Sequence, residues 1–69
     1  MAQQLRRLLI EAREAADLTQ TELANRLGHT QSFVSNYERG QRRLDVPEFI
    51  LICRALGLDP PKQMARLDG

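Results

Sequence analysis

The sequence is poor in the residue types that build metal sites, disulfides and aromatic cores. It has one cysteine, one histidine and no tryptophan, and aromatic residues make up 4% of its 69 residues. A lone cysteine excludes an intrachain disulfide and fits a reducing cytoplasm, and one cysteine with one histidine cannot complete a zinc site. We therefore expect Cys53 to be a small core residue, and we expect no metal or other cofactor.

Long hydrophobic runs are also missing. The longest, Phe49–Cys53, is far too short to cross a membrane, and residues 1–4 lack the apolar core of a signal peptide. Hydrophobic residues nevertheless make up 42% of the chain, which favours a globular fold over disorder. We expect one domain over residues 1–69, in the cytoplasm and without contact to a membrane.

No catalytic arrangement can be assembled from the sequence. Ser32 and Ser35 have no accompanying histidine and acid, His29 and Cys53 fall in separate segments, and there is no glycine-rich phosphate loop. A small hydrolase is therefore the weakest functional alternative. We expect a protein that is not an enzyme and has no catalytic residue or small-molecule ligand.

Signals for the start and end of helices recur along the chain. Gly28, Gly40 and Gly57 each follow an apolar-periodic segment, where a left-handed C-terminal cap favours glycine. Capping residues are expected to open three helices: Thr19 with Glu22 in a capping box, Thr30, and Asp45 ahead of Pro47. These signals predict an all-α protein with helices over about residues 3–16, 20–27, 31–39 and 45–56, and a short last helix from residue 59.

Apolar residues recur at helical spacing on one side of each expected helix. Because aromatic residues are scarce, the core must consist mainly of aliphatic side chains. Ile10 falls off the apolar stripe of the first helix. The predicted core residues are Leu5, Leu9, Ala12 and Ala16, then Leu23, Ala24 and Leu27, then Phe33, Val34 and Tyr37, then Phe49, Ile52, Cys53 and Leu56, and finally Met64 and Leu67.

The third expected helix carries an unusual set of polar residues. Where a helix that only faces solvent usually has Glu and Lys, this one has small or uncharged hydrogen-bonding side chains. Glutamine and asparagine present a paired donor and acceptor, and adenine shows the complementary pair in the major groove of DNA. An ordinary exposed face is the alternative. We interpret four residues as contacts to base edges: Gln31, Ser32, Ser35 and Asn36.

The positions of the charged residues are more informative than the net charge. The net charge of +1 is only a weak indication of a nucleic-acid partner. Arg39, Arg42 and Arg43, however, lie within five residues with no acid between them, and the arginine fork suits phosphate. We predict that these three arginines contact the DNA backbone, and a solvated basic loop is the alternative.

The segments that carry these features resemble a known family, the helix-turn-helix domain of phage repressors, Cro proteins and bacterial regulators of the XRE family. The likeness extends over about Leu5–Leu58. It implies a compact five-helix bundle of the lambda-repressor-like type, with the helix-turn-helix over residues 20–39 and the third helix as the reader. The residues that carry it are Leu18–Ala24, Leu27–Gly28, Gln31–Ser32, Val34–Ser35, Tyr37–Gly40 and Ala55–Gly57.

The resemblance also implies roles for single residues. Gln20 matches a residue that touches a phosphate, and Thr30 stands at a helix N-terminus, whose amides also suit phosphate. Arg13 and Glu38 match a pair that is held together under the reading helix, and two unrelated surface charges are the alternative. The loop Gln41–Val46 departs from that of some phage repressors.

We therefore expect a sequence-specific, DNA-binding transcriptional regulator, with a repressor as the first hypothesis. Its partner would be double-stranded DNA with a palindromic operator. We expect the protein to self-associate weakly in solution and to bind DNA as a homodimer. The resemblance implies Gly57–Pro61 as the contact between the two copies. We expect no dimerisation or ligand domain after Leu67.

The alternative is an antitoxin-type or other protein-interaction module with the same fold. Ile10, Met64 and Leu67 are its candidate contacts. Such a module needs an exposed apolar tail or patch to cover its target, and few residues follow Leu67.

Overall fold

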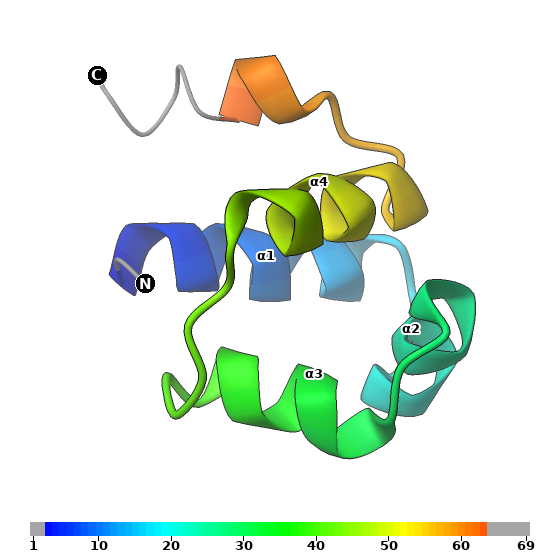
Figure 1. Ribbon diagram of the computed structural model, residues 1–69. Helices are drawn as coiled ribbons and strands as arrows, with labels where there is room; N and C mark the ends of the chain where they lie inside the picture. Colours follow the sequence, from blue (N-terminus) through cyan, green and yellow to red (C-terminus); the bar gives the residue numbers. More distant parts are fainter. Residues whose placement is uncertain (1–2, 64–69) are drawn as a thin grey trace.

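Four α-helices and a final helical turn surround a small apolar core in the computed structural model, which describes residues 3–63 (Figure 1). They are α1 (Gln3–Ala15), α2 (Gln20–Leu27), α3 (Gln31–Glu38) and α4 (Val46–Ala55), and the turn covers residues 60–63. No strand occurs among the described residues. The predicted all-α fold with five helices is confirmed.

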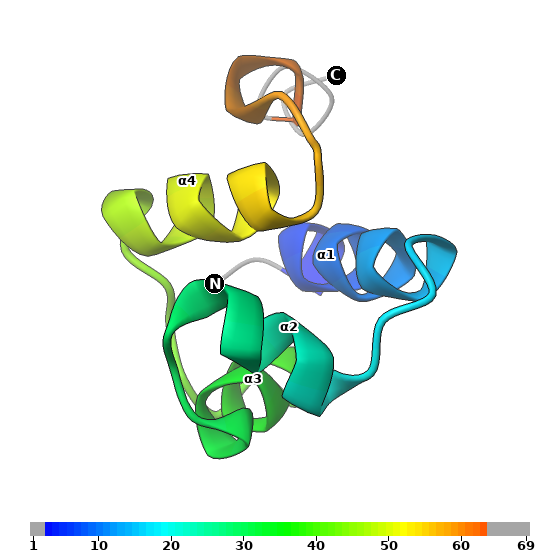
Figure 2. The ribbon, with the colours of Figure 1, turned by 90° about the vertical axis from the view of Figure 1, so that its right-hand side faces the viewer.

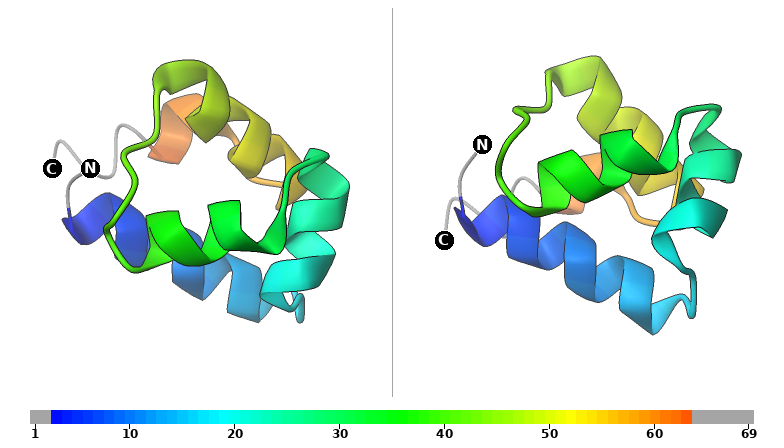
Figure 3. Two further views of the ribbon diagram at one scale, coloured as in Figure 1. Left: turned by 60° about the horizontal axis from the view of Figure 1, so that its bottom comes forward. Right: turned by 90° about the horizontal axis from the view of Figure 1, so that it is seen from below.

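The helices cross rather than align. Figure 1 shows α3 along the bottom, α1 and α4 above it, and α2 closing one end, and Figure 2 gives the same order from the side. α3 packs most extensively against α2 and also against α1, while α2 contacts α4. One side of α3 is therefore anchored, and the opposite side looks away from the other helices (Figure 3).

Aliphatic side chains from all four helices meet in the core. Leu9, Leu23, Val34 and Ile52 are fully buried, as the helical periodicity predicts. The prediction was wrong for Ala16, which is exposed because α1 ends at Ala15 and the chain turns away. Two further predicted core residues, Met64 and Leu67, lie outside the described residues.

The helices begin where the capping residues predict. Thr19 and Asp45 each complete a capping box, with Glu22 and Glu48 as the reciprocal partners. The backbone N–H groups of the two N-cap residues lower the pKa of the Glu22 and Glu48 carboxyls. The Thr30 hydroxyl accepts from the Phe33 amide at the start of α3.

The helix ends follow the glycines, with small shifts. Gly28, Gly40 and Gly57 all adopt the left-handed conformation, with φ of 71°, 79° and 74°. α3 and α4 each stop one residue earlier than expected, with Arg39 and Leu56 as C-cap residues. No glycine ends α1, so Asp17 takes the left-handed conformation instead, at φ 61°; aspartate is one of the few other residues that tolerate it.

Tyr37 gives a first test of the core. Its side chain is fully buried, and its hydroxyl has no hydrogen-bond partner in the part of the chain that the structure describes. Burial raises the pKa of this hydroxyl well above its usual value. Because an unpaired buried hydroxyl is costly, Tyr37→Phe should raise the free energy of unfolding by about 1 kcal/mol. Denaturant unfolding measures the change, and a clear loss of stability would mean that the hydroxyl is bonded in solution.

Candidate nucleic-acid interface

α3 presents its polar side chains away from the core. Val34 and Tyr37 anchor it, since both are fully buried. Among the four residues predicted to contact bases, Gln31 and Ser32 are exposed. The other two, Ser35 and Asn36, are half-buried. Their spacings of one, three and four residues bring them to one side of the helix. The structure thus brings the predicted base-contacting residues together on one surface.

The turn between α2 and α3 fixes the angle at which α3 leaves the core. Ala24, only 1% exposed, is small enough for the close packing of α3 on α2. The amide of His29 donates to the carbonyl oxygen of Ala24 at 3.0 Å. The His29 ring also stacks on Phe33, with ring centroids 4.1 Å apart, a contact that sequence analysis did not foresee. His29 therefore ties the turn to α3.

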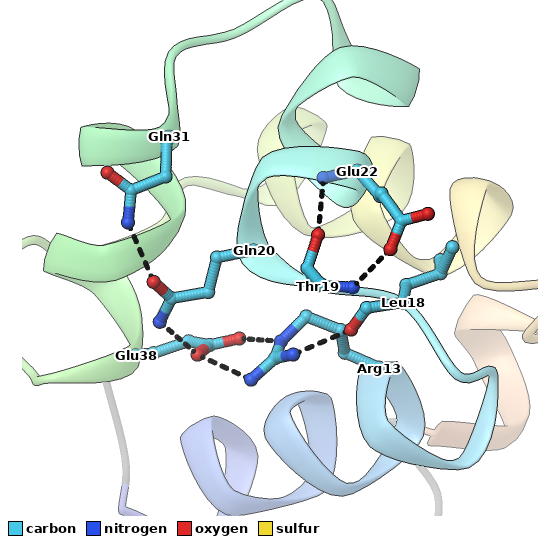
Figure 4. A network of polar contacts seen from close by, with 7 residues as sticks. All are labelled: Arg13, Leu18, Thr19, Gln20, Glu22, Gln31 and Glu38. Carbon is cyan, nitrogen blue, oxygen red and sulfur yellow. Dashed lines mark hydrogen bonds and ion pairs between the residues drawn. The ribbon is translucent and has the colours of Figure 1, made fainter.

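Arg13 and Glu38 form an ion pair between α1 and the end of α3 (Figure 4). Arg13 Nε lies 2.8 Å from Glu38 Oε2, and Nη2 lies 3.2 Å from Oε1. Arg13 Nη1 also donates to the Leu18 carbonyl at 2.7 Å. The bond to Glu38 raises the pKa of Arg13 further above its usual value. Only 13% and 6% of the two side chains are exposed, so the pair is largely shielded from water.

Two glutamines connect this ion pair to the first residue of α3 through hydrogen bonds (Figure 4). Gln20 Nε2 donates to Glu38 Oε1 at 2.9 Å, and Gln31 Nε2 donates to Gln20 Oε1 at 2.8 Å. A carboxylate only accepts hydrogen bonds, so Glu38 sets the orientation of the Gln20 amide, and Gln20 in turn sets that of Gln31. Gln31 keeps its Oε1 and one amide hydrogen for another partner.

Arg39 and Asn36 form a second linked pair at the other end of α3. Arg39 Nη2 donates to Asn36 Oδ1 at 3.0 Å. This bond uses the carbonyl oxygen of Asn36 and leaves both of its amide hydrogens available to an acceptor. Both residues belong to the polar side of α3, because positions 32, 36 and 39 follow one another at helical spacing.

Arg42 is held against the protein in a way that the sequence did not indicate. It forms an ion pair with Glu48, and its guanidinium carbon lies 5.0 Å from the centre of the Phe33 ring. Its side chain remains 46% exposed. In the sequence, Asp45 and Glu48 have the three-residue spacing of a capping box. That spacing could have indicated that the Glu48 side chain is held in place near Arg42. Arg43 is exposed, so the basic loop contains one partly neutralised arginine and one free of ion pairs among residues 3–63.

The described residues contain no group of three side chains that could hold a metal ion. Within residues 3–63, no helix has the length and the apolar composition that a membrane crossing requires.

Comparison with known proteins assigns this arrangement to a family. A sequence profile described as helix-turn-helix matches residues 9–63. No curated protein matches the chain. The solved structure of an XRE-family like protein from Pseudomonas syringae pv. tomato str. DC3000 is similar, with 55% sequence identity and a TM-score of 0.92. The match covers 96% of this chain and 80% of that chain.

Proposed function

Because the chain belongs to the XRE-type helix-turn-helix family of DNA-binding regulators, we propose that it reads a specific DNA sequence by inserting α3 into the major groove and acts as a repressor. The network that joins Gln31 to the buried Arg13–Glu38 pair is the observation that supports this most strongly. An exposed side chain that only contacts water is not usually oriented by a hydrogen-bond network. An oriented amide at a helix start suits a base edge, because that end of a reading helix enters the groove.

Gln31 is proposed to read adenine. Its free Oε1 can accept from the adenine N6 amino group, while its remaining amide hydrogen can donate to N7, which is the bidentate pairing that adenine offers in the major groove. The bond from Gln31 to Gln20 uses neither of these groups. The base contact therefore requires no break in the network.

The other polar residues of α3 would complete the reading surface. Ser32 is exposed beside Gln31, and Ser35 lies one turn further along α3. Asn36 would act chiefly as a donor, because Arg39 occupies its carbonyl oxygen. Major-groove acceptors such as guanine O6 and N7 or thymine O4 fit that donor.

Backbone contacts would surround this surface. Gln20 and Thr30 stand at the starts of α2 and α3, where free amides and the helix dipole favour a phosphate. The further proposed contacts are the arginines that follow α3, namely Arg39, Arg42 and Arg43. Such contacts position the protein on the duplex without reading its sequence.

The salt dependence of binding should distinguish two of these arginines. Each phosphate neutralised contributes about −0.9 to the slope of log affinity against log salt concentration. Arg43→Ala should flatten the slope by about one unit, whereas Arg42→Ala should change it less, because Glu48 already neutralises Arg42. Titrations of one duplex at several salt concentrations measure both slopes. Equal changes in the two variants would mean that Arg42 leaves Glu48 when DNA binds.

We also propose that two copies bind a palindromic operator. A symmetric dimer reads two half-sites about 34–36 Å apart, since one turn of the duplex returns the groove to the same face. The segment Gly57–Pro61, which is partly exposed beyond α4, is the proposed contact between copies. Self-association should be weak without DNA, and sedimentation showing a tight dimer of the free protein would contradict this.

Selection from a random DNA library tests the proposed function and returns the operator at the same time. We expect enrichment of a palindromic sequence, and a gel shift with that sequence that weakens as salt rises. Failure to enrich any sequence, together with weak binding to all duplexes, would instead favour the protein-interaction alternative.

A further inference from the structure

Arg6 of α1 lies over the backbone at the end of α3. Its guanidinium group occupies the space beside Gly40, where the Cβ of any other residue would overlap Arg6 Nη1. Figure 3 shows the segment after α3 passing beside the first half of α1. Arg6 Nη1 is the end of a flexible side chain that can shift, so it is the left-handed turn at φ 79° that calls for glycine at position 40.

An open hollow of about 540 Å³ lies between α1 and the end of α3. Arg6, Arg7 and Arg39 line it together with Ile10, and acids from the later turns of α1 complete it. Arg39 continues the row of polar side chains on α3, since it follows Ser35 and Asn36 at spacings of four and three residues. The hollow thus adjoins the end of the proposed reading surface.

Three arginines and three glutamates line the hollow. Neither Arg6 nor Arg39 forms an ion pair within residues 3–63, where the ion pairs are Arg13–Glu38 and Arg42–Glu48. Glu38, which also lines the hollow, is already engaged by Arg13 and Gln20. Arg6 and Arg39 thus line the same hollow without a carboxylate paired to either of them among residues 3–63, which leaves both guanidinium groups available to an anion.

We propose that Arg6 and Arg39 together bind one phosphate of the DNA backbone, so that α1 takes part in the DNA interface. This inference rests on the proposed function, because the anion is a phosphate of the same duplex that α3 enters. Arg39 brings the site to the edge of the reading surface, and the Arg6 guanidinium lies beside Gly40, the residue that follows Arg39.

The acids of α1 determine which end of the hollow the phosphate occupies. Glu11 and Glu14 line it with the arginines, but they lie one to two helical turns further along α1 than Arg6 and Arg7, a rise of about 6–12 Å. Their charge repels the backbone from that end. Glu11→Gln should therefore bind DNA about twofold more tightly at low salt, because a repulsion is removed.

The test compares Arg6→Ala with Arg54→Ala on the selected operator at several salt concentrations. Arg54 is the matched control, because it is an exposed arginine on α4, which lies across the molecule from α3 in Figure 1. We expect Arg6→Ala to weaken binding about tenfold at low salt and to flatten the salt slope by about one unit. Arg6→Lys should keep most of the slope, since the charge remains, and lose part of the affinity, since the fork is gone. Melting curves confirm that each variant is folded.

The outcomes separate this inference from the proposed function. If the wild-type protein shows no salt-dependent binding to the duplex, the proposed function fails. If the wild type binds and Arg6→Ala matches Arg54→Ala in affinity and slope, α1 takes no part in the interface and only this inference is overturned.

Discussion

Arg13→Met is expected to lower the free energy of unfolding by about 3–5 kcal/mol. The substitution leaves the Glu38 carboxylate, which is 6% exposed, with only the Gln20 amide as a partner. It also removes the donor to the Leu18 carbonyl. A domain of this size has a total stability of only about 3–10 kcal/mol, so a loss of this size would remove a large part of it. An exposed ion pair would cost only about 0–1 kcal/mol.

A double-mutant cycle separates the pair from its surroundings. Arg13→Met combined with Glu38→Leu removes both charges and should recover much of what either single change loses, because no unpaired charge remains in the interior. Denaturant unfolding of the wild type and the three variants measures the coupling. Additive losses would mean that the two side chains do not interact in solution.

Gln31→Ala should weaken binding to the best operator by about 1–3 kcal/mol and binding to random duplex much less. The change removes the side chain that the Gln20–Glu38 network orients. Gln31 is exposed, so the melting temperature should stay close to that of the wild type.

Asn25→Ala supplies the control for this comparison, since Asn25 is an exposed amide residue on α2 and takes no part in the network. It should bind both duplexes like the wild type. Equal weakening by Gln31→Ala on operator and random duplex, at an unchanged melting temperature, would make Gln31 a backbone contact.

The sequence was sufficient for the features that depend on a few neighbouring residues. The capping box of Thr19 and Glu22 and the left-handed glycine at position 28 follow from local backbone requirements. The burial of Val34 and Tyr37 follows from helical periodicity. These local signals place α2 and α3, and therefore the polar side of α3.

Other features need the tertiary structure, because they join residues whose proximity no spacing reveals. The Arg13–Glu38 pair spans 25 positions, and only the family resemblance indicated it. Nothing local places Arg6 over Gly40. Gln20 was expected to touch a phosphate, yet its side chain joins Glu38 to Gln31, which adds an orienting role to the proposed contact.

The central claim is that α3 reads bases, and a comparison of base preferences tests it most directly. The relative affinities of the wild type and of Gln31→Ala are measured for every single-base variant of the selected operator. We predict that the preference relaxes at one base pair in each half-site, where adenine is favoured by the wild type, and is retained at the other positions. A Gln31→Ala variant that keeps the wild-type preference at every position would contradict the account.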